Sequence, residues 1–551
     1  MSEKNYVVIS HAKPMNYRQD YVSLPKNYGT PQYYQREDVR SIIEIVEQNL
    51  TRLDEKTGFT RKLEDKKVVI KPNLVCVFSE AGFKERDYPE STDPRVMDAV
   101  IIFIKKYTPH IVIVESSGRG MPTRGSLHVS GLNRVARYHN LEIQALEEQP
   151  TDRYILPKAK VMKEIIVPEI FSEVAAGKAF YISVPKMKTN LYTGVTLGFK
   201  NAMGTITYNL RQRNHNYCIE QKLVDMLYLF KPDLTVIDGI IGGEGNCPAP
   251  VEPVDSHVIV SGTNSVETDR VATRMMGFEP REINLMRIAD EMGFDDPDVE
   301  VIGTEKVIPF RAADPSLMGE WMAEMFPNVK FLIGHMLNNA PEVKGMEADN
   351  ELMRSMEMTC RGGCLATTRY AFDMLYYENR RRNFKLNVII GDGVKRDGKI
   401  FYYDRDGRPY SVAEIAKLSG KKLAIGSCTT HLSGVVNRHV DGCMPMPNSP
   451  HMAVHWMSGT FCTVMSPKNR YILPLLTSTL RTCLSRIGQY RQGRRLDCAI
   501  QFDDSIVEPR RLSVQEKQQD YIPWPMPALS GHERRKLIAG EIRSMLATFR
   551  G

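Results

Sequence analysis

The sequence predicts an α/β protein built from two Rossmann-like domains with mainly parallel sheets. The first observation is length, because 551 residues exceed what one hydrophobic core supports. The second is order, since short apolar, β-branched runs alternate with segments of helical periodicity. The third is composition: 42% hydrophobic and 25% charged residues are typical of a folded protein and not of a disordered or coiled-coil chain.

The elements of the first domain follow in order. A strand is expected at 67–75, where KVVIKPNLV is β-branched and ends in a Pro-Asn turn. Asp93 precedes PRVMDAVIIFIKKY, and an acidic N-cap followed by proline predicts a helix. The run at 110–118 is the next strand, and the alternation continues through LNRVARYHN, AFYISVPK and LTVIDGIIGG. Strands in this order favour a parallel sheet.

A Pro-containing break after Gly303, VIPFRAADPSLMG, marks the predicted boundary between domains at 1–305 and 306–551. Downstream, the strands are VKFLIG, KLNVIIGDG and KKLAIGSC, with a helix in LATTRYAFDMLYYENRRR. Asp-Gly in YYDRDGRPY predicts a hairpin or turn. The tail at 515–527 is expected to be an extended arm leading to a last helix, ERRKLIAGEIRSML.

Several classes of protein are disfavoured. Lys plus Arg number 73 and Asp plus Glu 66, and this small excess of +7 does not indicate a nucleic-acid partner. The first residues lack the basic start and apolar stretch of a secretory signal, and no run of eighteen apolar residues occurs. We therefore expect a cytoplasmic protein without a membrane span. Neither a P-loop nor the G-x-G-x-x-G dinucleotide fingerprint is present.

Four lysines follow apolar strands or turns of the first domain: Lys71, Lys186, Lys188 and Lys200. Ligands of open α/β sheets bind at the carboxyl ends of the strands, and ammonium groups gathered there favour a carboxylate or a phosphate. The predicted partner is therefore an anionic small molecule. Acidic residues are expected to balance this charge or to hold a hard cation. The alternative is that these strand ends are polar simply because they meet water.

The same residues resemble a known family. VVIKPNLV, STDPRVMDAVI, VPKMKTNLYTGVTLGFKNAMGTI, LTVIDGIIGGEG and HVIVSGTNSVETDRVATRMMGF follow each other in the order seen in domain-of-unknown-function family 362, over roughly 66–303. The family motifs match here at Lys71-Pro72-Asn73, Pro185-Lys186-x-Lys188, Lys200-Asn201-x-x-Gly204 and Gly262-Thr263 with Asp269. Glu267 stands where smaller apolar residues are commoner. The resemblance implies frequent association with iron-sulfur modules.

The resemblance and the charge argument together define the predicted site. The catalytic group is expected to comprise Lys71, Asn73, Lys186, Lys188 and Asp238. The substrate-binding group is expected to comprise Lys200, Asn201, Glu244 and Asp269.

Four cysteines of the second domain have the context of cluster ligands. Cys360 and Cys364 form a Cys-x3-Cys with glycines between them, Cys428 ends a predicted strand, and Cys443 lies in a Pro-containing loop. Glycines leave room for a cofactor, and four thiolates match the ligand count of a 4Fe-4S cluster. A zinc site and unligated core thiols are the alternatives. His431 and His439 flank this loop, either to tune a cluster or to face solvent.

These segments, over roughly 329–450, resemble the proximal-cluster domain of nickel-iron hydrogenase small subunits and of their homologues in quinone-reducing complexes. The matching residues are the first cysteine pair, Gly426-Ser427-Cys428, and Gly442-Cys443-Met444-Pro445-Met446-Pro447. The chain departs from that pattern in the three-residue spacing of the first pair, in the closeness of the last two cysteines, and at Met444. The resemblance implies a 4Fe-4S cofactor on Cys360, Cys364, Cys428 and Cys443.

The remaining cysteines stand alone in sequence and are interpreted as buried hydrophobic residues: Cys76, Cys218, Cys247, Cys462, Cys483 and Cys498. Three functions follow from the whole pattern. The first is an iron-sulfur redox enzyme or electron-transfer component, for which we expect an anaerobic context and a redox partner protein. A homo-oligomer is a separate expectation. The second is a binding or assembly module with structural zinc or no metal. The third is a non-redox ligase or isomerase for a carboxylated or phosphorylated metabolite.

Overall fold

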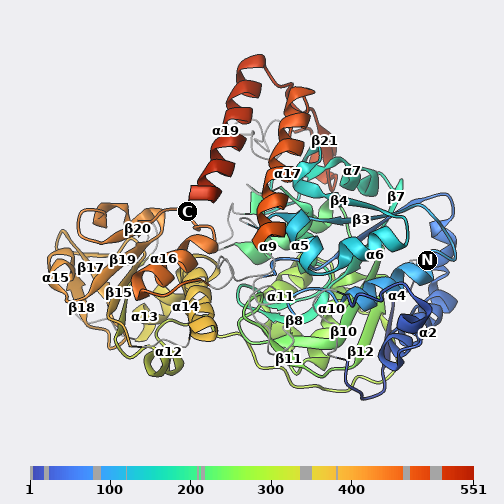
Figure 1. Cartoon of the computed structure of the whole chain (residues 1–551), viewed down its shortest axis with the longest axis horizontal. Coiled ribbons are helices and arrows are strands. Elements are labelled where there is room, and N and C mark those ends of the chain that lie inside the picture. The colour runs from blue at the N-terminus through green and yellow to red at the C-terminus, as the bar shows by residue number, and fades with distance from the viewer. Residues whose placement is uncertain are drawn as a thin grey trace. The chain divides into compact units, whose positions relative to one another are not determined.

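The structure is a computed structural model that describes residues 4–17, 24–77, 89–118, 121–207, 210–211, 218–335, 350–379, 383–462, 472–496 and 512–550. Contacts divide the chain into two compact units. The first unit comprises Met1–Arg213, Glu220–Ala312 and Arg470–Gly551, and the second comprises Asn214–Ile219 and Ala313–Asn469. Each unit has an α/β architecture with a largely parallel central sheet (Figure 1), which confirms the predicted fold class.

The sheet of the first unit has the strand order β13-β1-β12-β10-β7-β2-β3-β4. The strands from β10 to β4 pair in parallel, whereas β12 is antiparallel to both its neighbours. Three further strands, β8, β9 and β11, extend the β10 side. The bounds are β1 (Tyr6–His11), β2 (Lys67–Pro72), β3 (Ile111–Glu115), β4 (Glu142–Ala145), β7 (Ala179–Val184), β8 (Lys186–Asn190), β9 (Gly194–Thr196), β10 (Leu234–Glu244), β11 (Glu252–Val254), β12 (Val258–Gly262) and β13 (Glu300–Ile302).

Two helices cover opposite faces of this sheet, α2 (Glu37–Thr57) and α10 (Ser265–Met275). Asn49 of α2 is buried and donates from Nδ2 to the side-chain hydroxyl oxygen of Ser10 at 3.1 Å. Val7 and Ile9 lie in the apolar cluster that contains Met275 of α10. Alternate residues of β1 therefore face different helices, as the period of two in a strand requires.

The remaining helices of the first unit include the one predicted after Asp93. That helix is α4 (Pro94–Ile104), and the Asp93 carboxylate accepts a hydrogen bond from the Arg95 N–H at 2.9 Å. Aspartate at the N-cap and proline in the first turn thus start the helix as expected. The others are α1 (Pro31–Tyr34), α5 (Thr123–Val129), α6 (Leu132–Tyr138), α7 (Glu169–Ala175), α9 (Ile219–Asp225) and α11 (Asn284–Glu291).

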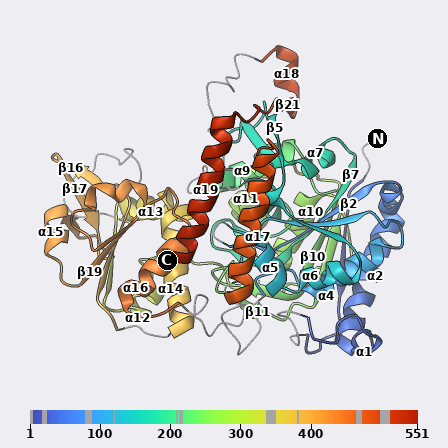
Figure 2. The same ribbon diagram turned by 45° about the horizontal axis from the view of Figure 1, so that its top comes forward.

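The C-terminal segment belongs to the first unit, although the sequence assigned it to the second domain. Its elements are α17 (Ile472–Arg491), α18 (Val514–Gln518), β21 (Ile522–Trp524) and α19 (Gly531–Arg550), and Figure 2 shows α17 and α19 side by side. β21 pairs antiparallel with β5 (Thr151–Ile155), which itself pairs with β6 (Glu164–Pro168). The Thr482 hydroxyl donates to Glu148 Oε1 at 2.8 Å. The pairing of β21 with β5 and the hydrogen bond from Thr482 to Glu148 thus attach the C-terminal segment to the rest of the first unit.

The second unit has a sheet with the order β16-β17-β14-β15-β19-β20, in which β14, β15, β19 and β20 are parallel. The predicted Asp-Gly turn joins β17 to β18 in an antiparallel pair. The strands are β14 (Val329–Ile333), β15 (Leu386–Ile390), β16 (Val394–Arg396), β17 (Lys399–Tyr403), β18 (Pro409–Ser411), β19 (Lys421–Ile425) and β20 (Arg438–Val440). The helices are α12 (Glu320–Met325), α13 (Asn350–Thr359), α14 (Ala366–Asn379), α15 (Val412–Lys417) and α16 (Asn448–Ser458).

The described ranges contain no helix that is both long enough and apolar enough to cross a bilayer.

Candidate functional site

Lys71 lies at the end of β2 and forms a buried ion pair with Glu115 at the end of β3. Lys71 Nζ is 2.8 Å from Glu115 Oε1, and the two side chains are 1% and 2% exposed. Burial lowers the pKa of Lys71, and the charge of Glu115 opposes that change. A Cβ on Gly204 would lie 2.7 Å from both Lys71 Nζ and Glu115 Oε1. The glycine of the Lys-Asn-x-x-Gly turn is therefore needed because the ion pair occupies that space.

Asn201, in the same turn, links the ends of β2 and β7. Its Oδ1 accepts hydrogen bonds from Lys71 Nζ at 3.2 Å and from Asn73 Nδ2 at 3.1 Å, while its Nδ2 donates to Ser183 Oγ at 3.1 Å. Two buried oxygens beside this network, Asn73 Oδ1 and Glu115 Oε2, accept no hydrogen bond from the described residues. Buried acceptors without a donor are uncommon, and these two are available to a ligand.

Lys186 and Asp238 form a second buried ion pair. β8 and β10 are parallel, and their register places the two residues side by side. Lys186 Nζ is 2.6 Å from Asp238 Oδ2, and neither side chain is exposed. The same carboxylate accepts the Asp93 N–H at 2.7 Å, at the start of α4. Burial raises the pKa of Asp238, and the charge of Lys186 opposes it. The charge of Lys186 is thus compensated within the protein.

Lys200 opens the turn Lys200–Thr205 and lies among other cations. Burial, the largest cause, and the charges of Lys188, Lys71 and Arg211 lower the pKa of Lys200 to about 7. Among the described residues no carboxylate forms an ion pair with its ammonium group. An amine that is half protonated near neutral pH can bind an anion or exchange a proton with it.

Two of the predicted acidic residues contact groups other than the lysines. Asp269 accepts hydrogen bonds from the Gly198 N–H at 2.6 Å and the Phe199 N–H at 3.0 Å, and burial raises its pKa to about 8. It therefore fixes the backbone just before Lys200. Glu244 accepts the Arg311 N–H at 2.8 Å and is partly exposed.

The structure gathers Lys71, Lys188 and Lys200 into one electrostatic group, which we call the lysine group. Lys188 is fully buried and donates to the Glu90 carbonyl oxygen. Sequence reasoning assigned no role to Glu115 or Arg211. Glu115 lies in the strand predicted at 110–118, but only the β2–β3 pairing shows that it meets Lys71. Arg211 lies in no motif, and its Nη1 donates to the Ser117 carbonyl oxygen at 2.7 Å.

In the second unit, Cys360 and Cys364 lie on a tight turn between α13 and α14. Cys360 caps a short π-helical turn, Arg361–Leu365, and its Sγ accepts the Cys364 N–H at 3.2 Å. Both side chains are buried. Gly363 within the turn has φ −132° and ψ −116°, a conformation outside the helical region. The two thiols therefore lie on the same side of a backbone shaped by glycine.

The turn after β19 brings Cys428 to the same place. Gly426 has φ +107°, and a Cβ there would be 3.0 Å from Cys364 Sγ and 3.3 Å from Cys428 Sγ. Gly442, next to Cys443, has φ +127°. Both glycines occupy backbone conformations that other residues rarely adopt. The chain thus passes close to two sulfur atoms at Gly426 because this position lacks a side chain, whereas a Cβ on Gly442 would meet Pro445 at 2.6 Å.

All four thiols interact electrostatically. Burial raises the pKa of Cys428 to about 12, with further contributions from Cys360 and Cys443. The pKa of Cys364 rises mainly through its hydrogen bond to Cys360, and then through burial and the charges of the other three. Four thiolates in one place need a cation to compensate them. This donor set and the glycine clearance fit a metal centre with four cysteine ligands, as an iron-sulfur cluster has.

His431 and His439 contact the backbone of the cysteine loops. His439 Nε2 is 3.1 Å from the Gly426 carbonyl oxygen, and His431 Nδ1 is 3.1 Å from that of Cys428. These contacts hold the backbone beside the cysteines.

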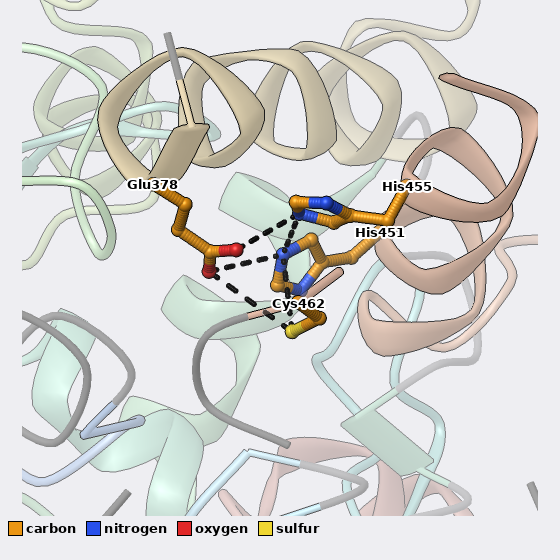
Figure 3. A group of neighbouring side chains, drawn as sticks. All are labelled: Glu378, His451, His455 and Cys462. Atoms are coloured by element: carbon orange, nitrogen blue, oxygen red, sulfur yellow. Dashed lines mark hydrogen bonds and ion pairs between the residues drawn. The ribbon is translucent and has the colours of Figure 1, made fainter. Parts of the chain in front are cut away.

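A further group in the second unit was missed by sequence reasoning. Glu378, His451, His455 and Cys462 place one potential metal-ligand atom each within 4.8 Å of one another (Figure 3). The available signal was the spacing of four between the histidines of SPHMAVHW, which puts both on one helix face. Cys462 is buried as expected, but it lies beside polar groups.

Two of the other described cysteines also have polar partners, since Cys76 Sγ is 3.9 Å from Glu90 Oε1 and Cys247 Sγ is 3.6 Å from the Thr189 hydroxyl. Cys76, Cys247 and Cys483 are buried, and Cys218 is half-buried. Cys498 lies outside the described residues.

Comparisons with known proteins find a family likeness in the region that contains the lysine group. A family described as Domain of unknown function (DUF362) matches residues 68–274, which confirms the resemblance predicted for the N-terminal part. Thylakoid-associated protein sll1697 of Synechocystis sp. is 25% identical over 126 residues, which make up 22% of this chain and 39% of that protein. No solved structure matches the chain. The region similar to the DUF362 family includes Lys71, Lys188 and Lys200.

Proposed function

We propose that the chain is an iron-sulfur redox protein that acts on an anionic small molecule. The observation that carries this proposal is the convergence of the thiols of Cys360, Cys364, Cys428 and Cys443. The likeness of these segments to the proximal-cluster domain of hydrogenase small subunits supports the same assignment. These cysteines would hold a 4Fe-4S cluster, which supplies one-electron transfer when bound.

The exposure of the cysteines suits this role. Cys360 and Cys364 are buried, whereas Cys443 is exposed. Two of the ligands would therefore be shielded from water and one would lie near the surface. Solvent exposure and hydrogen bonds to the sulfurs both tune the potential of such a cluster, and the Cys364 N–H already points at Cys360 Sγ.

The lysine group would bind the substrate. Lys200 has no carboxylate partner among the described residues, and Lys71, Lys188 and Arg211 add positive charge around it. A carboxylate or phosphate would remove this repulsion and would favour the protonated amine. Because the pKa of Lys200 is about 7, the amine can also deliver or accept a proton during a redox reaction at neutral pH.

Metal analysis of protein purified without oxygen tests the cluster assignment. We expect about four irons per chain, and Cys428→Ser should lose most of this iron. Cys483→Ser is the matched control, because Cys483 is a buried cysteine of the first unit, and it should keep the iron. Zinc bound by these four cysteines in place of iron would overturn the redox proposal and favour a binding or assembly module.

A further inference from the structure

A second group of donor atoms in the second unit comes from three chain segments. Glu378 lies in α14, His451 and His455 lie one turn apart on α16, and Cys462 follows that helix. Figure 3 shows the carboxylate, the two imidazoles and the thiol pointing toward one another. None of these residues is among the four cysteines of the proposed cluster.

The separations of the donor atoms are those of ligands around one ion. His451 Nε2 is 3.1 Å from His455 Nε2 and 3.7 Å from Cys462 Sγ. The Glu378 oxygens lie 3.5 Å from His451 Nε2 and 3.0 Å from His455 Nε2. Tetrahedral zinc, with bonds of about 2.0 to 2.3 Å, keeps such donors about 3.3 to 3.6 Å apart. An ion at the centre would therefore need only small shifts of the side chains.

The four side chains of this group are polar and yet buried. The side chains of Glu378, His451 and His455 are at most 2% exposed, and Cys462 is 4% exposed. A buried carboxylate that stays ionised needs a persistent positive partner.

The surroundings also orient one imidazole for a metal. His455 Nδ1 is 2.9 Å from Thr460 Oγ1, and that hydroxyl can donate to the His455 carbonyl oxygen at 3.4 Å. With its hydrogen used in that way, the hydroxyl accepts the proton of Nδ1. The Nε2 of a neutral His455 is then left with a free lone pair, which is the arrangement found for metal-bound histidines.

We propose that Glu378, His451, His455 and Cys462 bind one divalent transition-metal ion of the zinc class. Two nitrogens, one sulfur and one oxygen suit such an ion, whereas calcium and magnesium prefer all-oxygen sites. Four protein ligands complete a tetrahedral shell, so the ion acts structurally. It ties α14 to α16 and to the segment after it. The alternative is a metal-free network in which a protonated histidine neutralises Glu378.

X-ray absorption at the zinc edge tests the site directly. Full-length protein is purified without oxygen, treated with a chelator and given one equivalent of Zn²⁺. We expect a shell of one sulfur and three nitrogen or oxygen neighbours. Four sulfur neighbours would mean that zinc occupies the cysteine set, and a shell of oxygens alone would mean loose surface binding. Either result on the wild-type protein would overturn the proposal, even if no variant folds.

Variants assign the ligands. His455→Gln should weaken zinc binding by at least about tenfold, and Cys462→Ser should remove the sulfur neighbour while the iron content stays unchanged. His532→Gln is the control, because His532 is exposed on α19 of the first unit, and it should bind zinc normally. Unchanged zinc affinity in both ligand variants would favour the metal-free network. Since iron and zinc are counted separately, failure of this site is distinguishable from failure of the iron-sulfur assignment.

Discussion

At the scale of single residues, Lys200 and Asp269 both have pKa values near neutral pH, and Lys200 is the one that carries positive charge. The pKa of Lys200, about 7, lies below the ordinary 10.5. The charged form prevails below pH 7, so we expect sulfate to bind best there. Its affinity should then fall by up to about tenfold per pH unit above 7. Isothermal titration across this range measures the effect, and sulfate serves as the probe because its charge stays constant.

Lys200→Met should abolish this pH dependence, whereas Lys178→Met, at an exposed position, should preserve it. The substitution should also raise the free energy of unfolding of the unliganded protein near pH 7. We expect an increase of at least about 1 kcal/mol, a lower bound set below the free energy that corresponds to one pKa unit. The reason is that the unfolded chain binds more protons than the folded one between pH 7 and 10.5, so this lysine's contribution to stability rises with pH there. Sulfate binding that is equal at all pH values would contradict the assignment.

The Lys186–Asp238 pair is expected to be structural. Asp238→Asn leaves a buried ammonium without its counter-charge, and we expect a loss of about 3 to 5 kcal/mol in the free energy of unfolding. Replacing both residues, as Lys186→Met with Asp238→Leu, should recover much of that loss. Chemical denaturation measures both.

The half-exposed pair Lys67–Glu173 provides the comparison. Glu173→Gln should cost no more than about 1 kcal/mol, since exposed ion pairs contribute little. If Asp238→Asn and Glu173→Gln lowered the free energy of unfolding equally, the buried pair would contribute no more to stability than the half-exposed pair.

At the scale of elements, the turn after β19 passes close to two of the cysteine sulfurs at Gly426. Gly426→Ala places a Cβ 3.0 Å from Cys364 Sγ and forces a conformation that costs an alanine about 1 to 3 kcal/mol. We expect this variant to lose most of its iron. In Gly434→Ala, a Cβ meets nothing within 4 Å, so iron should be retained. Full iron content in Gly426→Ala would show that the turn does not form the cluster site.

The sequence predicts elements well where the signal is local. The start of α4 follows from Asp93 and Pro94, and the pairing of β17 with β18 follows from Asp406-Gly407. It fails where contacts join distant segments. β21 adds to β5 across more than 350 residues, so a linear pattern gives no sign that the C-terminal segment joins the first unit.

At the scale of the whole molecule, the sequence also indicates those candidate site residues that lie in local motifs and misses those brought together from distant segments. The lysines and the four cysteines were predicted because they occur in short sequence motifs, at strand ends or in glycine- and proline-containing turns. Glu115 and Arg211 were not, because their proximity depends on strand pairing and on the path of the chain. The group around Glu378 also escaped detection, since Cys462 lies 84 residues from Glu378 in the sequence.

The central claim is that the second unit holds a 4Fe-4S cluster. The most direct measurement combines iron and inorganic sulfide content with electron paramagnetic resonance of the reduced protein, all prepared without oxygen. We expect about four irons and four sulfides per chain and the signal of a reduced cluster that Cys428→Ser abolishes. Protein that contains neither iron nor sulfide, with the four cysteines holding zinc or no metal, would contradict the claim.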